Sequence, residues 1–189
     1  MNSCASFVKK SKYNNEGYPV TPCSTANIIS ITNLIRENLG LFDEEKLPLL
    51  PILEFYMPMI YSDFTFGVKE KGEMQEREGE TIPQSNSIFL REDVYENLCN
   101  DDGRARFTAA HELGHYWLHR NQGVNLQRKQ GGNIKIYCNS EWQADTFAAH
   151  FLMPSHLIAK YRDPLIIAAR FAVSMQAAEI RLNKLLKRV

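Results

Sequence analysis

Residues 111–115 read His-Glu-Leu-Gly-His, and this pentapeptide constrains the fold more than any other stretch of the 189-residue chain. His111 and His115 are four residues apart, so on a helix both imidazoles project from one face with Cβ atoms about 5–6 Å apart, and one divalent ion can bind both. Glu112 lies about 100° further round such a helix, where its carboxylate can reach a metal-bound water and act as a general base. The pattern therefore predicts a helix that carries a metal site.

The residues on either side of the pentapeptide predict where this helix begins and ends. Capping and turn residues occupy 100–103, and the stretch 104–119 contains no proline and a single glycine, Gly114. Apolar or small residues recur at spacings of three and four beside the histidines: Phe107, Ala110, Gly114 and Leu118. This face is therefore expected to be buried. Two histidines on a buried face are costly to keep for packing alone, so metal ligation explains them better than a core role.

A third ligand is needed, because a catalytic zinc usually has three protein ligands. Ser140 and Gln143 form a capping-box pattern, which predicts a second helix with Glu141 in its first turn. Without the histidine pair Glu141 would be an ordinary acid at a helix N-terminus, where the helix dipole keeps it ionised. With the pair it is the predicted third ligand. Asp145, one turn further along, is predicted to accept the outer ring N–H of a ligating histidine.

Three other histidines and a cysteine are competing candidates, and none of them is predicted to bind the metal. His119 lies about 6 Å further along the helix axis than the second motif histidine, which puts it at the surface or behind a ligand. His150 is on roughly the opposite side of the second helix from Glu141, and His156 lies beyond the end of that helix. Cys138 is near enough in sequence, but a hydrolytic zinc of this pattern uses histidine and carboxylate ligands.

Two blocks of the chain match a known family in order and spacing. Residues 107–116 read FTAAHELGHY, and residues 141–154 read ExxADxFAAxxLMP, with x for positions outside the pattern. These blocks resemble the ImmA/IrrE family of metallo-endopeptidases. The similarity continues through 169–182 and is diffuse before Gly103. The first block departs mildly at Ala109, where a larger apolar residue is common.

The resemblance implies a thermolysin-like arrangement of the site. It implies these ligands on zinc: His111, His115 and Glu141. It also implies Glu112 as the base and Asp145 as the residue that orients a histidine. Members of the family are intracellular regulators, and some cleave a helix-turn-helix repressor, so a protein substrate of that kind is implied as well.

Length and composition predict one compact domain in the cytoplasm. With 189 residues, 44% of them apolar, and a formal net charge of zero, the chain can bury a substantial core and has no overall attraction to nucleic acid or membrane. The first ten residues lack the apolar core of a signal peptide, and the apolar stretch 47–61 is too short to span a bilayer. Four scattered cysteines without C-x-x-C spacing indicate reduced thiols. We expect residues 1–22 to form a tail and residues 23–189 a single metallopeptidase domain.

The pattern of apolar residues predicts an α+β fold, mostly helical, with a small three-stranded sheet beside the helix of the metal site. A helix is expected within 24–40 and a short one within 47–61. The strands are expected at 64–68, 87–91 and 134–137. The charged run 69–80 is interpreted as a solvated hairpin arm between the first two strands. The loop 121–133 is interpreted as a connector that could act as a lid.

The C-terminal part, residues 157–189, is predicted to form two helices that resemble a helix-turn-helix. Asp163 and Pro164 begin the first helix, and Ser174 caps the second. Residues 156–189 hold seven Lys or Arg against two acids, which suits a nucleic-acid or acidic protein partner. The second helix nevertheless begins without Lys or Arg at the end that would read DNA, and its cations lie where the helix dipole favours them anyway. Direct DNA binding is therefore the less favoured interpretation.

Together these observations predict a zinc-dependent endopeptidase that uses one zinc ion and Glu112 as its base, and that cleaves a regulatory protein such as a helix-turn-helix repressor. The alternatives are a non-proteolytic regulator that binds DNA or a repressor, and the toxin of a toxin-antitoxin pair. A hydrogen-bond donor to the oxyanion is also needed. The candidates left open for this donor are Tyr116, Tyr137, His119, His150 and His156. The sequence predicts no oligomeric state.

Overall fold

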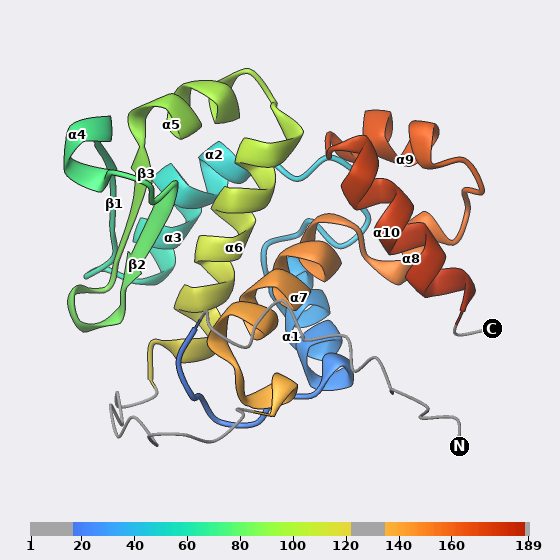
Figure 1. Cartoon of the computed structure of the whole chain (residues 1–189), viewed down its shortest axis with the longest axis horizontal. Helices are drawn as coiled ribbons and strands as arrows, with labels where there is room; N and C mark the ends of the chain where they lie inside the picture. Colours follow the sequence, from blue (N-terminus) through green and yellow to red (C-terminus); the bar gives the residue numbers. More distant parts are fainter. Residues whose placement is uncertain (1–16, 122–134, 188–189) are drawn as a thin grey trace, which may run out of the picture.

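The computed structural model describes residues 17–121 and 135–187. A small sheet lies on one side of the molecule and a group of helices on the other, with the long helix α6 (Gly103–His119) between them (Figure 1). This arrangement confirms the predicted α+β fold, mostly helical with one small sheet. Among the described residues no helix combines the length and the apolar character needed to cross a membrane.

Helices account for most of the described chain. The other α-helices are α1 (Thr25–Asn38), α2 (Leu49–Pro51), α3 (Met57–Ile60), α4 (Lys71–Met74), α5 (Glu92–Cys99), α7 (Ser140–Leu152), α8 (Ser155–Ile158), α9 (Pro164–Phe171) and α10 (Met175–Leu186). A π-helical segment, η1 (Ile52–Tyr56), joins α2 to α3, and two short 3-10 helices are η2 (Pro83–Ser85) and η3 (Ile136–Cys138). The helices expected within 24–40 and 47–61, the motif helix and the two C-terminal helices are all confirmed.

The sheet has three strands: β1 (Thr65–Lys69), β2 (Gly79–Ile82) and β3 (Ser87–Arg91). Their order is β1-β3-β2, with β1 parallel and β2 antiparallel to β3. In this register Thr65 pairs with Ser87 and Gly79 pairs with Leu90. The two strands predicted at 64–68 and 87–91 are therefore confirmed, and β2 is the edge strand that packs against α6.

Two predictions about the sheet are wrong. Residues 136–138 form the 3-10 helix η3 rather than a strand, and residue 134 lies outside the described residues. The run 69–80 is not a hairpin arm, because β1 and β3 are parallel and the chain passes through α4 into β2. The third strand is Gly-Glu-Thr-Ile. It lacks the apolar alternation by which strands are recognised, so its pairing with β3 could not be read from its own residues.

The two helices of the predicted site begin at side-chain caps. For α6, the Asp102 side chain accepts hydrogen bonds from the backbone N–H groups of Arg104 and Ala105. For α7 the cap is Asn139, which accepts from the N–H of Trp142 at 2.9 Å. The predicted capping box of Ser140 and Gln143 is therefore wrong, although the helix begins where expected.

Ser140 and Gln143 do not cap α7 because residues 17–23 use their side chains. The Ser140 hydroxyl accepts a 3.0 Å hydrogen bond from the N–H of Tyr18. The Gln143 amide donates to the carbonyls of Thr21 and Tyr137 at 2.9 and 2.8 Å. Residues 17–22, which the sequence placed in the tail, thus lie against the start of α7. Residues 1–16 and 122–134, which include most of the possible lid, lie outside the described residues.

A glycine lets α6 and α7 approach closely at the site. A Cβ added at Gly114 would lie 3.1 Å from the Cβ of Phe147 and 3.2 Å from the Cα of Ala144. Both of these residues are on the buried face of α7. The two helices share more close contacts than any other pair of elements among the described residues. Their packing brings the start of α7 beside the middle of α6.

Candidate metal centre

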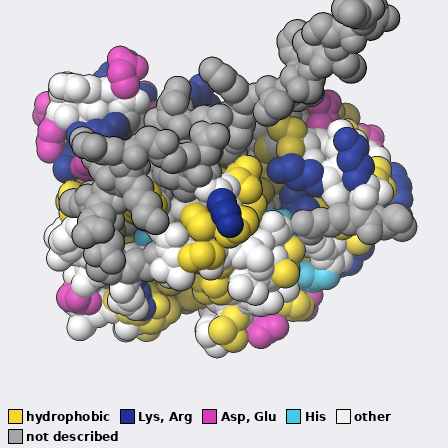
Figure 2. Space-filling view, turned by 60° about the horizontal axis from the view of Figure 1, so that its bottom comes forward, with side chains coloured by type: hydrophobic (Ala, Val, Ile, Leu, Met, Phe, Trp, Pro, Cys, Tyr) yellow, Lys and Arg dark blue, Asp and Glu magenta, His cyan; other side chains and the backbone are white. Residues whose placement is uncertain are grey.

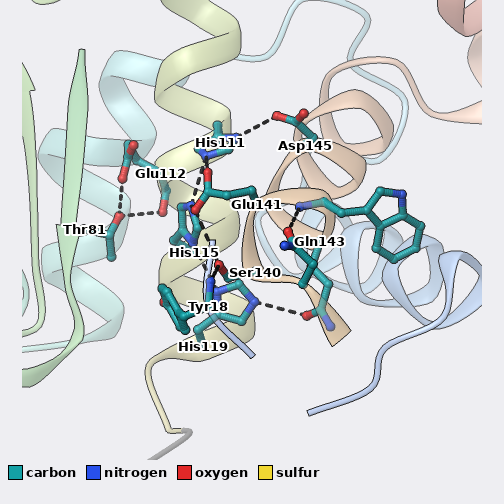
Figure 3. Close-up of polar contacts among 12 residues, drawn as sticks. Tyr18, Thr81, His111, Glu112, His115, His119, Ser140, Glu141, Gln143 and Asp145 are labelled. Carbon is teal, nitrogen blue, oxygen red and sulfur yellow. Dashed lines mark hydrogen bonds and ion pairs between the residues drawn. The ribbon is translucent and has the colours of Figure 1, made fainter. Parts of the chain in front are cut away.

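Three side chains from two helices converge where α6 and α7 pack together (Figure 3). His111 and His115 extend from α6 and Glu141 from the first turn of α7, and one donor atom of each lies within 4.8 Å of the others. The two Nε2 atoms are 2.9 Å apart. The carboxylate of Glu141 contacts both rings, with 3.3 Å to Nε2 of His111 and 3.4 Å to Nε2 of His115. The structure thus brings the three predicted ligand residues together.

The outer nitrogen of His111 faces a carboxylate, as the sequence predicted. Nδ1 of His111 lies 3.0 Å from Oδ1 of Asp145. A carboxylate in this position accepts the Nδ1–H of the ring, so in the neutral ring the lone pair is on Nε2. Nε2 is the atom that points toward Glu141 and the second histidine.

The outer nitrogen of His115 is fixed by a chain of hydrogen bonds that the sequence did not predict. Nδ1 of His115 lies 3.2 Å from Nδ1 of His119, and Nε2 of His119 lies 3.1 Å from Oε1 of Gln143. The amide nitrogen of Gln143 donates to two carbonyls, so its oxygen faces His119 and accepts. His119 therefore donates through Nε2 and accepts through Nδ1, so the Nε2 of His115 carries the lone pair.

The pKa of His119 agrees with its role as an acceptor. Burial, followed by the neighbouring His115, lowers the pKa of His119 to about 4, so the ring is neutral at physiological pH. Only a neutral imidazole has a ring nitrogen that can accept a hydrogen bond. The sequence predicted that His119 lies either at the surface or behind a ligand. The structure shows the second position, because His119 is 2% exposed and lies directly behind His115.

The carboxylates around the two rings favour positive charge between them. Burial alone lowers the pKa of His111, but the hydrogen bonds that its ring donates to Asp145 and Glu141 outweigh it and raise the pKa to about 10. Burial alone would raise the pKa of Glu141, but the two imidazoles hold it well below its usual value. The same negative potential favours a divalent cation at Nε2 of His111. Binding of that cation would release the proton from the ring.

Glu112 lies beside the three-residue cluster, on the side of α6 that faces the sheet. Its side chain is 7% exposed. The Thr81 hydroxyl on β2 lies 2.6 Å from Oε2 of Glu112 and 3.0 Å from its carbonyl oxygen (Figure 3). Gly79, also on β2, packs so closely that an added Cβ would lie 2.6 Å from Cγ and 2.8 Å from Oε1 of Glu112. The edge strand therefore holds the carboxylate in one position beside the ligand cluster.

A family model of the IrrE N-terminal-like domain matches residues 69–183 of the chain. The chain belongs to the ImmA/IrrE family. The match covers β2, α6 and α7, and so all the residues of the cluster and its supports described above. Membership in this family of peptidases supports a metallopeptidase type of function. Among curated proteins, none matches this ImmA/IrrE family chain.

The remaining candidate ligands lie outside the three-residue cluster. His150 is buried on α7, and its Nδ1 lies 2.9 Å from a guanidinium nitrogen of Arg181. His156 is in the short helix α8, where its ring stacks on Phe42 with 4.3 Å between centroids. Cys138 is at the end of η3 and is not part of the three-residue cluster found among the described residues.

Tyr18 is another residue near the site that the sequence did not predict. Its ring lies edge-on to His119, with 6.1 Å between centroids. Burial, then the charges of Glu141 and Glu112, raise the pKa of its hydroxyl, so the group remains a neutral donor. Its approach depends on a contact with Ser140, which is 122 positions away in the chain. No local pattern could have predicted that contact.

The other tyrosine candidates for an oxyanion donor differ from Tyr18 in their surroundings. Tyr116 is fully buried on α6, its ring packs edge-on against Phe64, and its hydroxyl accepts from Arg120 at 3.2 Å. Burial raises the pKa of Tyr116 and Arg120 opposes that rise, whereas the pKa of Tyr18 responds to the carboxylates of the site. Tyr137 is 39% exposed in η3. Tyr18 is therefore the tyrosine whose hydroxyl is coupled to the ligand cluster by charge.

Gly79→Ala is expected to reduce peptidase turnover while leaving the metal content unchanged. The added methyl group would overlap the Glu112 side chain and displace it, and a misplacement of about 1 Å can cost roughly 100-fold in rate. Steady-state kinetics and metal analysis of the purified protein would measure both quantities. Gly72→Ala is the control, because nothing lies within 4 Å of a Cβ at Gly72. Equal turnover in the two variants would contradict this role of β2.

His119→Phe is expected to weaken metal binding. The variant keeps an aromatic ring but removes the acceptor for Nδ1–H of His115, and losses of this type typically weaken metal affinity about 10–100-fold. Competition against a chromophoric chelator would measure the dissociation constant. His156→Phe serves as the control, since that ring stacks on Phe42 away from the cluster. If His119→Phe binds metal as tightly as this control, His119 does not orient His115.

Proposed function

We propose that this chain is a zinc-dependent endopeptidase in which His111, His115 and Glu141 hold the ion and Glu112 is the general base. The observation that carries the proposal is the convergence of two inward-facing Nε2 atoms and one carboxylate, with the outer nitrogen of each ring already occupied. A tetrahedral zinc with bonds of about 2.0–2.1 Å has neighbouring ligand atoms roughly 3.3–3.4 Å apart. The contacts of the two Glu141 oxygens with the rings, 3.3 and 3.4 Å, match that spacing, and the two Nε2 atoms, 2.9 Å apart, would have to separate slightly to bind the ion.

The number of protein ligands supports a catalytic rather than a structural ion. A structural zinc usually has four protein ligands, whereas a catalytic one has three and keeps a position for water or substrate. Among the described residues the cluster contains three. When bound, the ion supplies Lewis acidity, which polarises a scissile carbonyl and lowers the pKa of water.

The residues of the chain carry the proton transfers. Glu112 takes a proton from the attacking water and returns it to the leaving amine. The hydrogen bond from Thr81 engages Oε2 of Glu112, so Oε1 is the oxygen that remains for this exchange. Gly79 has no side chain beside Oε1, where even a methyl group would lie within 2.8 Å. The strand thus orients the base, and close packing of Gly79 against the Glu112 side chain is possible only without a Cβ.

The proposed substrate is a regulatory protein, such as a helix-turn-helix repressor, and the proposed compartment is the cytoplasm. Both proposals draw on the family to which the chain belongs. The cysteines in the described part of the chain, Cys23, Cys99 and Cys138, are free thiols, as expected in a reducing compartment.

Direct DNA binding through α10 receives less support. A Cβ at Gly103 would lie 2.4 Å from the backbone nitrogen of Ser174, so the residue that caps α10 packs against the first residue of α6. In a helix-turn-helix, the first residues of the second helix contact the bases. That end of α10 is close to the body of the protein here.

Glu112→Gln and Glu141→Ala are expected to separate chemistry from metal binding. Glu112→Gln keeps the shape of the side chain but removes the proton acceptor, so proteolysis should fall by at least about 100-fold while one zinc ion per chain is retained. Glu141→Ala should lose zinc, because a ligand and its negative charge are removed. Zinc stoichiometry by mass spectrometry of metals and cleavage of an unstructured protein would be measured together.

The control for both variants is Glu179→Ala, which removes an exposed glutamate on α10 outside the cluster. It should match the wild type in both measurements. Undiminished cleavage by Glu112→Gln would rule out this base. Unchanged zinc content in Glu141→Ala would rule out the ligand assignment. Cleavage that continues in excess chelator would reject metal-dependent proteolysis altogether.

Tyr18→Phe is expected to lower kcat with little change in KM. We propose that the neutral Tyr18 hydroxyl donates to the oxyanion, and removing one such donor typically costs about 100–1,000-fold in kcat. Tyr137→Phe is the matched control, because Tyr137 and Tyr18 are 39% and 37% exposed. A similar kcat for the two variants would leave Tyr18 without a role in the reaction.

A further inference from the structure

A large groove extends from the metal centre between α6, α7 and α10. Its volume is about 1140 Å³. Thr108 on α6 and Asp145 on α7 line the end nearest the metal centre, since Asp145 contacts His111. Lys184 on α10 and Lys187, directly after its end, line another part of it. The proposed reaction uses one border of this groove and leaves the rest unexplained.

Apolar side chains from three helices line much of the groove. They are Phe107 from α6, Trp142 and Ala149 from α7, and Ala177 and Ile180 from α10. Ile180 is 49% exposed although it is large and apolar. In Figure 2, apolar side chains gather near the centre of the face shown, and Lys and Arg side chains lie to their right, the side on which Figure 1 places α9 and α10. A concave apolar surface of this size is typical of a binding site.

The charged side chains of the groove that lack an ion-pair partner among the described residues are lysines. Its two carboxylates already have partners, because Glu78 pairs with Arg104 at 2.6 Å and Asp145 with His111 at 3.0 Å. Lys184 and Lys187 form no ion pair with any residue that the structure describes. An incoming carboxylate can therefore pair with these lysines without displacing an internal partner.

The walls of the groove decide which form of peptide fits. Most of the residues that line the groove belong to α6, α7 and α10, whose backbone N–H and C=O groups are bonded within each helix, and Glu78 lines it one position before β2. Along these three helices an extended strand finds no sheet edge to pair with, so recognition there must occur through side chains. An amphipathic helix supplies an apolar stripe for such a floor and charged residues for its rim.

We propose that this groove binds an amphipathic helical segment of the protein substrate, with its apolar stripe on Trp142 and Ile180 and its acidic side chains against Lys184 and Lys187. As a docking site for substrate, it rests on the proposed function. Docking here places the adjoining part of the substrate beside the metal centre, because Asp145 borders both sites. The binding energy of the helix then lowers KM for the whole protein relative to a short peptide.

The test uses zinc-loaded full-length Glu112→Gln protein, so that a bound peptide is not cleaved. The probes are three fluorescein-labelled 18-residue peptides: one with a leucine stripe at helical spacing and glutamates beside it, one with lysines in place of the glutamates, and one with the acidic composition scrambled. Fluorescence anisotropy would measure their affinities. The acidic amphipathic peptide should bind roughly tenfold or more tightly than either of the others.

Paired variants on α10 locate the binding. Ile180→Ser and Leu186→Ser remove side chains that are 49% and 47% exposed, and of the two only Ile180 lines the groove. Ile180→Ser should weaken binding of the acidic peptide, and Leu186→Ser should not. The double variant Lys184→Glu, Lys187→Glu should reverse the preference in favour of the lysine peptide. Thermal melting followed by circular dichroism would verify that each variant is folded.

Several outcomes would overturn the proposal. Equal affinities for the acidic and basic peptides would do so, as would equal losses in Ile180→Ser and Leu186→Ser. Self-association of the chain that Ile180→Ser abolishes, seen by sedimentation, would assign the groove to a second copy instead. Preference for a duplex DNA probe over the acidic peptide would assign it to nucleic acid.

A separate assay distinguishes failure of docking from failure of the proposed function. Wild-type protein would be incubated with an unstructured protein, with and without a chelator. Cleavage that the chelator abolishes, together with no preference among the peptides, rejects the docking site and keeps the peptidase. Selective peptide binding without any cleavage keeps a binding groove but rejects its role in presenting a substrate.

Discussion

Two imidazole nitrogens face each other 2.9 Å apart in a largely buried setting, and the residues around them hold the outer nitrogen of each ring. Two lone pairs at this distance repel unless a proton or a metal ion lies between them. Asp145 fixes the outer nitrogen of His111, and Gln143 acts through His119 to fix that of His115. Neither ring can turn or exchange tautomer without breaking a buried hydrogen bond. The negative charges that surround the pair make a cation the favoured occupant.

This arrangement depends on the position of the first turn of α7, which long-range contacts fix from two sides. Because Gly114 has no side chain, α7 can pack closely on α6. A Cβ added at Gly114 would lie 3.1 Å from the Cβ of Phe147. Residues 17–23 then hold Ser140 and Gln143 by hydrogen bonds. Gly17 has φ +87°, and a Cβ there would lie 2.9 Å from Cγ of Glu141. The segment before α1 therefore helps to position a proposed ligand.

The parts of the site that could be predicted are those encoded by local spacing. His111 and His115 are one helical turn apart, and Glu141 and Asp145 repeat that spacing on a second helix, so each pair faces one direction whatever the rest of the fold does. Tyr18 and Gly79 could not be predicted, because their roles depend on contacts with residues far away in the chain. The same reason explains the missed strand β2, whose pairing with β3 is set by tertiary packing rather than by its own residues.

Two faces of α6 contact different parts of the fold, one the helices and the other the sheet. The histidine face meets α7, so the helices position the proposed metal ligands, while Glu112 meets β2, so the sheet positions the proposed base. The groove lies on the helical side, bordered by Asp145. A substrate docked there would approach the proposed metal centre past Asp145 and Glu78, the residue that precedes β2. Metal affinity, turnover and substrate affinity thus depend on different neighbours of a single helix, which allows each to change in a related protein without loss of the other two.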